Sequence, residues 1–176
     1  AHTVRTPALR YRLEDFIVGD SNRLAFTAAQ RIAQTDCPRS FSPLFIHGAC
    51  GLGKTHLLQG IAQHAREAGG GRAVVYTTAE AFTNEYINAL RASRLEAFRR
   101  SYRAVKLLCI DDVQFFSNKQ ATQSELLHTF DAIDLEGARI VLASDEHPRA
   151  VRKFSSALVS RFMAGMVVRL DAPEPA

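Results

Sequence analysis

The segment from Gly48 to Thr55 constrains the fold of this chain more than any other part of its sequence. It reads GACGLGKT, which matches the pattern G-x-x-x-x-G-K-[ST], and it lies between the apolar run LFIH (44–47) and a helical pattern. Glycines let the backbone N–H groups of such a loop approach phosphate oxygens, and the N-terminus of the following helix adds partial positive charge. The segment therefore predicts a strand, a loop and a helix that together bind a nucleoside triphosphate.

The residues of this loop are the candidate nucleotide contacts. We expect the contacts to come from Gly48, Ala49, Cys50, Gly51, Leu52, Gly53, Lys54 and Thr55. Lys54 is expected to reach the β and γ phosphates as a point charge that packs against little else. Thr55 is expected to place its hydroxyl on Mg²⁺. The loop thus predicts a nucleotide that binds together with magnesium.

The second half of such a site is a strand that ends in an acid, and the segment LLCIDD (107–112) has this form. Its apolar residues predict a buried strand that brings Asp111 to the carboxyl edge of a sheet, where open α/β sheets bind ligands. We expect Asp111 to hold Mg²⁺, either directly or from behind a direct ligand. Asp112 is the candidate to orient and polarise the attacking water. The alternative is that the two acids cap the next helix.

Short apolar runs alternate with longer helical patterns along the chain. The expected strands cover residues 44–47, 74–77, 105–111, 139–144 and 166–170. This alternation is typical of a parallel sheet flanked by helices, and 176 residues with 47% apolar side chains suffice for one compact domain. Two helical patterns fill residues 79–103, where a strand–helix–strand unit needs one helix, so we expect an insertion there.

Helix boundaries are predicted from local signals. A threonine or serine followed three residues later by glutamate marks three helix starts, at Thr77, Ser93 and Thr122. Pro148 suits the first turn of a fourth helix. The glycines at 69–71 are expected to end the helix that follows the phosphate loop.

Two further polar side chains are candidates. Asp145 follows the fourth expected strand, which neighbours the third in a sheet of this kind, so its side chain can respond to a γ-phosphate. The alternative is a turn-forming aspartate before His147 and Pro148. Arg161, in the segment VSRF, is on its own an ordinary surface residue.

Composition limits the class of protein. Lysine and arginine outnumber the acids 22 to 18, and most of the basic residues are arginine, which permits a nucleic-acid partner but equally suits a solvated surface. Arginines at positions 91, 94, 99, 100 and 103 cluster in the expected insertion, where they either contact phosphates or simply face solvent. Three cysteines without metal-ligand spacing indicate a reducing, cytoplasmic location, and no apolar run is long enough to span a membrane.

Together these motifs resemble the AAA+ ATPases, and within them the bacterial chromosomal replication initiators. LEDFIVGDSN (13–22) resembles their N-terminal box, IDDVQFF (110–116) their acid box, IVLASDEHP (140–148) their sensor-1 segment and SRF (160–162) the box with the arginine finger. Residues 79–103 resemble the pair of helices that initiators insert. The resemblance implies a three-layer α/β P-loop NTPase core over residues 1–176, with a five-stranded parallel sheet and the insertion between strands two and three.

The resemblance also implies roles for single residues. It assigns Ile17, Val18 and Asn22 to the surroundings of the adenine and Asp145 to the sensor. Arg161 becomes the finger that touches the γ-phosphate of a neighbouring subunit. Asp112 stands where most AAA+ proteins have glutamate, and its shorter reach implies slow hydrolysis, which suits a switch better than a motor.

The function implied is ATP-dependent assembly on origin DNA and opening of the duplex. The expected ligands are ATP or ADP with Mg²⁺. The expected partners are origin DNA, including single strands held by the insertion, further copies of the full-length protein joined through Arg161, and a replicative helicase or its loader. A helical lid and a helix-turn-helix domain are expected to be absent from this sequence, which alone is expected to be nearly inactive.

The sequence departs from the pattern of the initiators at three positions, and two other functions are possible for a chain with these motifs. Initiators commonly have arginine where this chain has Ala121, and an acid and a second arginine where it has Ser156 and Ala157. The alternative within the superfamily is a helicase loader or a regulatory relative of the initiators. A metabolic P-loop kinase is a third possibility, but the chain shows no second substrate-binding motif.

Overall fold

The computed structural model describes residue 4 and residues 6–172, so the proline-containing segment 173–176 lies outside the described residues. Five strands form one sheet: β1 (Leu44–His47), β2 (Val74–Thr78), β3 (Leu107–Asp111), β4 (Arg139–Ser144) and β5 (Met166–Arg169). All paired strands are parallel, and their order is β2-β3-β4-β1-β5. The predicted parallel sheet is confirmed, with each strand within two residues of its expected bounds.

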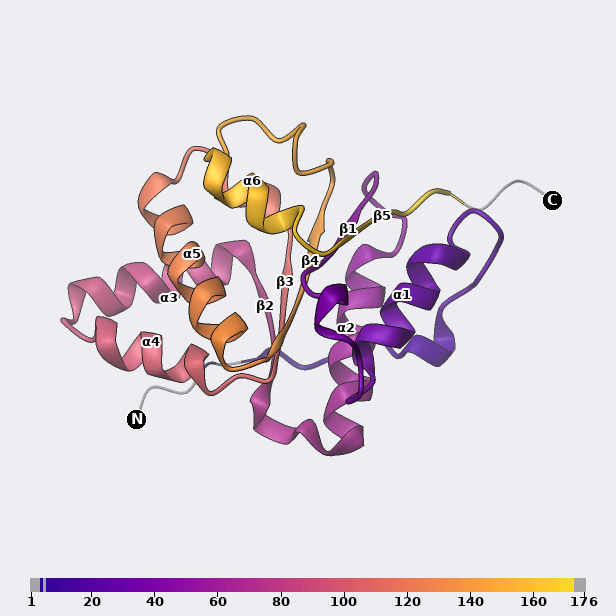
Figure 1. Ribbon diagram of the computed structural model, residues 1–176, viewed down its shortest axis with the longest axis horizontal. Coiled ribbons are helices and arrows are strands. Elements are labelled where there is room, and N and C mark those ends of the chain that lie inside the picture. Colours follow the sequence, from indigo (N-terminus) through magenta and orange to yellow (C-terminus); the bar gives the residue numbers. More distant parts are fainter. Residues whose placement is uncertain (1–3, 5, 173–176) are drawn as a thin grey trace.

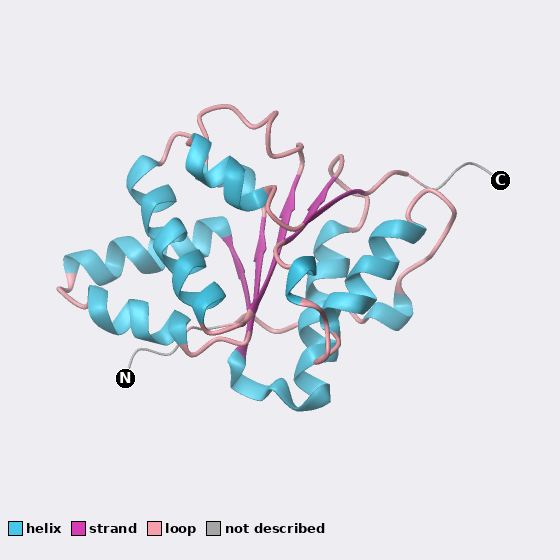
Figure 2. Cartoon of the chain, viewed as in Figure 1, coloured by secondary structure: helices cyan, strands magenta, loops and turns pink. Residues whose placement is uncertain are grey.

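Helices cover both faces of this sheet (Figures 1 and 2). One face carries α1 (Arg23–Ala33) and α2 (Lys54–Ala65). The other carries α3 (Ala79–Arg91), α4 (Leu95–Arg103), α5 (Gln120–Leu135) and α6 (Ser156–Phe162). The three-layer α/β architecture is therefore confirmed. No helix in the described part of the chain is long and apolar enough to cross a bilayer.

The layers follow from alternation along the strands. On β1, Leu44 and Ile46 pack with α1 and α2, whereas Phe45 packs with the helices of the opposite face. Successive side chains of a strand point to opposite faces, and here both faces are covered. This is why the strands read as continuous apolar runs.

The insertion occupies the predicted residues, because α3 and α4 together span 79–103. Phe82 of α3 is fully buried, with its ring centroid 5.5 Å from that of Phe98 and 5.3 Å from that of Tyr102, both on α4. The same ring lies 5.8 Å from Phe116, which follows β3. The apolar side of the insertion is thus part of the core.

Two of the predicted helix starts in this region are wrong. Thr78 caps α3, because its side chain accepts a hydrogen bond from the Ala81 N–H at 3.1 Å, whereas the adjacent Thr77 is buried. Ser93 does not cap α4, since it has a positive φ of 53° and lies in the link between the two helices.

The other two predicted starts are also wrong. Thr122 lies inside α5, which begins at Gln120, and its side chain is buried. Pro148 does not lie in the first turn of a helix, because the next helix, α6, begins at Ser156. The side chain of Ser155 caps α6 by accepting a hydrogen bond from the Leu158 N–H at 3.2 Å. The glycine stop is confirmed: α2 ends at Ala65, and the helical turn that follows it, Arg66–Gly70, contains Gly69 in a non-helical conformation with a φ of 102°.

Candidate nucleotide-binding site

The phosphate loop connects β1 to α2 at the carboxyl edge of the sheet. Its Gly53 has a φ of 98°, a conformation that glycine adopts without strain. A Cβ at Gly53 would also lie 2.9 Å from Cε2 of Phe16, so the N-terminal box packs directly on the loop. Ala49 and Cys50 are exposed at the outer turn of the loop. The loop is therefore open to solvent on one side and fixed by an aromatic ring on the other.

Lys54 is buried, with 6% of its surface exposed. Its Nζ donates to the carbonyl oxygens of Gly48 at 2.6 Å and Ala49 at 2.9 Å, and it lies 2.9 Å from Oδ1 of Asp145. The expectation that this side chain packs against little else is wrong, because the loop folds around the ammonium group. Three acceptors match its three hydrogens, so an incoming phosphate competes with Asp145 and the two carbonyls.

Asp111 lies at the end of β3, with 1% of its surface exposed. Its Oδ2 accepts hydrogen bonds from the Thr55 hydroxyl at 2.6 Å and the Tyr76 hydroxyl at 3.0 Å. Its Oδ1 accepts from the Asp112 N–H at 2.9 Å. Burial of Tyr76 and the charge of Asp111 raise the pKa of the tyrosine, so the phenol remains a donor. The structure thus brings together Thr55 and Asp111 as predicted.

These oxygens fit a magnesium ion. Mg²⁺ prefers oxygen ligands and is usually bound by one or two protein groups together with substrate phosphates and water. The Thr55 hydroxyl gives its hydrogen to Asp111, which leaves the lone pairs of its oxygen available to a cation. Within the described residues no cluster of three or more histidines, cysteines or acids could hold a metal alone, so most ligands of the ion would come from the nucleotide and water.

Asp112 and Asp145 are linked through Gln114. Asp112 is half-buried and has a left-handed backbone with φ of 55°, and its side chain makes no capping hydrogen bond to the turn η5 (Val113–Phe116). The Gln114 Nε2 donates to Oδ1 of Asp112 at 3.3 Å and to Oδ2 of Asp145 at 3.2 Å. Burial and the nearby charge of Asp111 raise the pKa of Asp112. The two predicted catalytic acids therefore share one amide.

A hollow of about 320 Å³ lies over the phosphate loop and the side chains of Asp112 and Asp145. Its lining residues are Tyr11, Cys50, Gly51, Gly53, Lys54, Thr55, His56, Asp112 and Asp145. The rings of Tyr11 and His56 are stacked, with their centroids 4.8 Å apart. The hollow is thus lined by charged side chains, such as Lys54 and Asp145, and by the stacked rings of Tyr11 and His56. This combination suits a phosphate chain joined to a planar base.

The N-terminal box stands beside this hollow. Ile17 is 83% exposed and Val18 is 40% exposed, and neither lines the hollow. Asn22 is buried, and its amide is used locally: its Nδ2 donates to the Ile17 carbonyl at 3.0 Å, and its Oδ1 accepts from the Gly19 N–H at 2.8 Å. Asn22 therefore shapes the turn that carries Ile17 and Val18.

Arg161 lies away from this hollow. It is near the end of α6 and lines a small cavity with Ser42 and Pro43, which precede β1 at the amino edge of the sheet. Its guanidinium pairs with Asp131 of α5, and about half of each side chain is exposed. The phosphate loop is at the opposite end of β1. Arg161 therefore does not reach the nucleotide site of its own chain.

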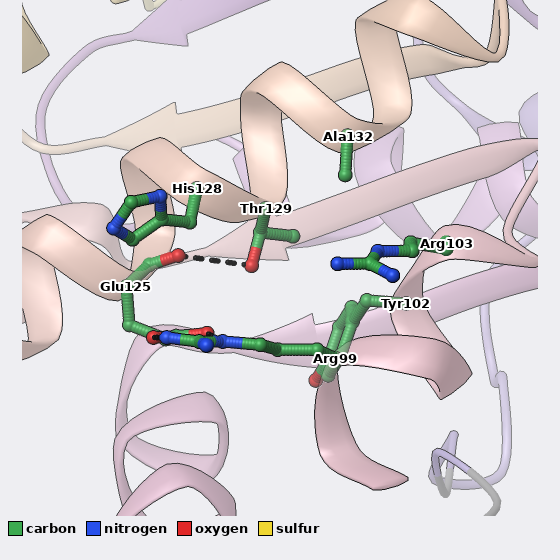
Figure 3. A pocket seen from close by; sticks show the side chains of 7 residues that line it. All are labelled: Arg99, Tyr102, Arg103, Glu125, His128, Thr129 and Ala132. Carbon is green, nitrogen blue, oxygen red and sulfur yellow. Dashed lines mark hydrogen bonds and ion pairs between the residues drawn. The ribbon is translucent and has the colours of Figure 1, made fainter. Parts of the chain in front are cut away.

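An ion pair between Arg99 of α4 and Glu125 of α5 lines a small pocket of about 120 Å³ between the insertion and α5 (Figure 3). Arg99 donates from Nε and Nη2 to the two carboxylate oxygens of Glu125, each at 2.9 Å, and Glu125 is 2% exposed. Arg99 therefore does not simply face solvent, because this acid holds its guanidinium in the chain itself. The other arginines of the insertion are exposed: Arg91, Arg94, Arg100 and Arg103.

Comparison with known proteins agrees with this geometry. A family model described as the bacterial DnaA ATPase domain matches residues 8–169. The chromosomal replication initiator protein DnaA of Francisella tularensis subsp. novicida is 40% identical over 165 residues, which cover 94% of this chain and 33% of that protein. This chain belongs to the bacterial DnaA ATPase domain family. It spans about a third of the length of the curated DnaA proteins that it matches.

Solved DnaA structures have the same fold. Domain III of DnaA from Thermotoga maritima has a TM-score of 0.90 at 40% identity, with 96% of this chain and 70% of that chain covered. A DnaA bound to AMPPCP and single-stranded DNA has a TM-score of 0.86 at 40% identity, with 92% of this chain and 50% of that chain covered. Membership of the DnaA family identifies the chain as an AAA+ ATPase domain and does not favour a helicase loader or a metabolic kinase.

Three residues at this candidate site were not predicted from the sequence: Tyr11, His56 and Gln114. Gln114 stands two residues after Asp112, within the acid box, so its proximity was available from spacing. Tyr11 and His56 are 45 positions apart in the sequence, and only the packing of the N-terminal segment against α2 brings their rings together. No local signal predicts that contact.

Proposed function

We propose that this chain is the ATP-binding core of a chromosomal replication initiator. In this proposal, ATP lets subunits assemble on origin DNA and open the duplex, and slow hydrolysis ends the assembled state. The observation that carries the proposal is that one chain has a phosphate site and an exposed arginine at opposite edges of its sheet. Such a chain can offer its arginine only to the nucleotide of another subunit.

The residues of the phosphate site have distinct roles in this proposal. The loop N–H groups and Lys54 would hold the phosphates, and Thr55 and Asp111 would hold Mg²⁺, which when bound would neutralise charge on the phosphates. The oxygen of a water attacks the γ-phosphorus as the bond to the β–γ bridging oxygen breaks, and ADP leaves with that electron pair. Asp112 accepts the proton of the water, and its short side chain makes this step slow.

Assembly depends on Arg161. Its guanidinium can meet two oxygens of the γ-phosphate on the adjacent subunit in a bidentate fork, which ADP does not provide. The relative bound to AMPPCP and single-stranded DNA supports a DNA partner, and the exposed arginines of the insertion are the groups that would contact its phosphates. We further propose a cytoplasmic location, where a replicative helicase or its loader would join the assembly.

The test uses a full-length initiator that carries this domain. Arg161→Ala should bind ATP like the parent but fail to form the ATP-dependent oligomer, with hydrolysis reduced on the order of a thousandfold. Oligomerisation is measured by sedimentation with ATP and with ADP, and hydrolysis by phosphate release.

A mixture gives the sharper result. Arg161→Ala supplies an intact nucleotide site, and a Lys54→Ala protein supplies an intact arginine, so hydrolysis should partly return only when the two are mixed. Normal assembly of Arg161→Ala with ATP would show that this arginine is an ordinary surface residue and would remove the main support for the switch.

A further inference from the structure

Gln114 is a neutral side chain that joins the two candidate catalytic acids described above. Its Nε2 lies 3.3 Å from Oδ1 of Asp112 and 3.2 Å from Oδ2 of Asp145, and its Oε1 accepts from the Asp145 N–H at 3.3 Å. The other oxygen of Asp145 pairs with Lys54 at 2.9 Å. A continuous chain of contacts therefore runs from the lysine of the phosphate loop through Asp145 and Gln114 to Asp112.

A carboxamide suits this position for a chemical reason. Its NH₂ group has two hydrogens, one for each carboxylate, and its oxygen can accept from a backbone N–H. A glutamate would lose both donors and add a third negative charge beside Asp112 and Asp145. An apolar side chain would remove the donor that the two acids share, and Asp145 would keep only Lys54 as a partner. Glutamine therefore holds two like charges together at a fixed separation.

We propose that Gln114 is a positioning residue of the nucleotide site, which fixes Asp112 relative to Asp145 and so to the phosphate held at Lys54. This inference rests on the proposed function, because it assigns Gln114 to the reaction that Asp112 carries out. A phosphate that replaces Asp145 at Lys54 removes one partner of that carboxylate. Gln114 then keeps Asp145 in place from the other side, and with it the position of Asp112.

Two substitutions separate positioning from structural support. Gln114→Met keeps the length of the side chain and removes all three hydrogen bonds. Gln114→Glu keeps the shape and replaces the donor group with a charge. Gln30→Glu is the matched control, because Gln30 is exposed on α1 and the variant makes the same change in net charge. Binding of fluorescent ATP and ADP analogues is measured on this chain, and single-turnover hydrolysis on the full-length initiator.

The expected results differ between the variants. Gln114→Met should bind both nucleotides within about twofold of the parent, yet hydrolyse ATP on the order of a hundredfold more slowly, the cost of displacing a catalytic group by about 1 Å. Gln114→Glu should also bind ATP on the order of tenfold more weakly while ADP binding changes little, because it adds a negative charge beside Asp112 and Asp145, which line the hollow where the γ-phosphate is expected. Gln30→Glu should match the parent in every measurement.

Three outcomes would overturn the inference. If Gln114→Met hydrolyses ATP at the parent rate, Gln114 positions nothing. If it binds ATP and ADP equally poorly and melts at a clearly lower temperature, its role is only to hold the fold. If the parent chain itself does not bind ATP, or Lys54→Ala binds it normally, the proposed function fails and the inference fails with it. The first two outcomes leave the proposed function standing.

Discussion

Two almost fully buried carboxylates, Asp111 and Glu125, are satisfied in opposite ways. Asp111, 1% exposed, accepts hydrogen bonds from the Thr55 and Tyr76 hydroxyls and one backbone N–H. Glu125, 2% exposed, meets the guanidinium of Arg99 with both of its oxygens. In the described part of the chain no lysine or arginine forms an ion pair with Asp111. One carboxylate is bound by neutral donors and the other by a cation.

The kind of partner, neutral donors for Asp111 and a cation for Glu125, distinguishes a candidate ligand site from a contact that only supports the fold. Neutral donors fix the geometry of Asp111 but leave its negative charge uncancelled in a buried position, where a small cation would be stabilised. Arg99 cancels the charge of Glu125 inside the protein, so nothing further is needed there. In our proposal the carboxyl edge therefore receives an ion and an anionic ligand, whereas the ion pair between α4 and α5 needs no further charged partner.

The largest expected effect is at the nucleotide edge. Lys54→Ala should weaken ATP binding by a hundredfold or more. We expect Lys54 to donate two hydrogen bonds to charged phosphate oxygens, which together contribute about 3 kcal/mol. The carbonyls of Gly48 and Ala49 and the Asp145 side chain lose a donor. The fold should survive, because Asp145 is 42% exposed and Ala49 lies on the side of the loop that is open to water. Titration with a fluorescent ATP analogue measures the first effect, and a thermal melt followed by circular dichroism measures the second. A loss of the folded signal would instead make Lys54 a structural residue.

The ion pair between α4 and α5 should respond in the reverse manner. Arg99→Gln leaves Glu125 buried without its cation and should destabilise the chain by about 3 kcal/mol, the lower end of the range for breaking a buried pair, because Arg99 is 31% exposed. ATP affinity should stay unchanged. Urea unfolding measures the stability, and Arg100→Gln, at an exposed neighbouring position, is the control.

A double substitution tests whether charge is the cause. Replacing the pair together, as Arg99→Met with Glu125→Leu, should recover most of the lost stability, since apolar side chains of similar volume often substitute for a buried ion pair. A double variant as unstable as Arg99→Gln would show that shape rather than charge compensation holds α4 on α5.

The uncancelled charge of Asp111 gives a smaller effect that depends on metal. The parent should bind ATP on the order of tenfold more tightly with Mg²⁺ than with EDTA, a difference of about 1.4 kcal/mol. In Asp111→Asn this ratio should fall to about one, because the ion loses the charge that attracts it. Titrations of both proteins under both conditions measure the ratio. An unchanged ratio in the variant would show that Mg²⁺ is held by the nucleotide alone.

Much of the fold could be predicted from the sequence, and the reason is visible on particular elements. The strands are buried on both faces, so apolar runs mark them, and the helices at 79–103 carry their own amphipathic patterns. The prediction of helix starts was wrong where two adjacent residues could each cap the helix. Thr77 and Thr78 are the same residue type, and adjacent side chains of a strand point to opposite faces of the sheet. Only the Thr78 side chain reaches the Ala81 N–H. Pairings between distant segments, such as Arg99 with Glu125, leave no local signal.

The candidate site was predictable to the same extent. The acids and the phosphate loop follow strand ends, which converge in any parallel sheet, so Thr55 and Asp111 could be paired in advance. The burial of Lys54 and the link through Gln114 depend on how closely the end of β4 approaches the acid box. That distance is set by packing and not by the spacing of residues.

The smallest expected effect concerns the exposed arginines of the insertion. Because Arg99 is occupied by Glu125, the side chains left for a polyanion include Arg91 and Arg94, which face solvent. Each phosphate contact that is lost lowers the slope of log affinity against log salt by about 0.7 for single strands. Arg91→Gln with Arg94→Gln in the full-length initiator should therefore weaken binding of a thymidine oligonucleotide by several-fold at physiological salt and lower this slope by about 1.4.

The control for this prediction is a second pair of arginines with the same change in net charge. Arg23 and Arg31 lie on α1 and pair with Asp20 and Asp36. Substituting both by glutamine should leave the salt slope unchanged, because side chains already paired with acids release no counterions from DNA. Equal slopes for the two double variants would mean that the insertion acts only through overall charge. A lower slope in the insertion variant alone would show that Arg91 and Arg94 contact the strand.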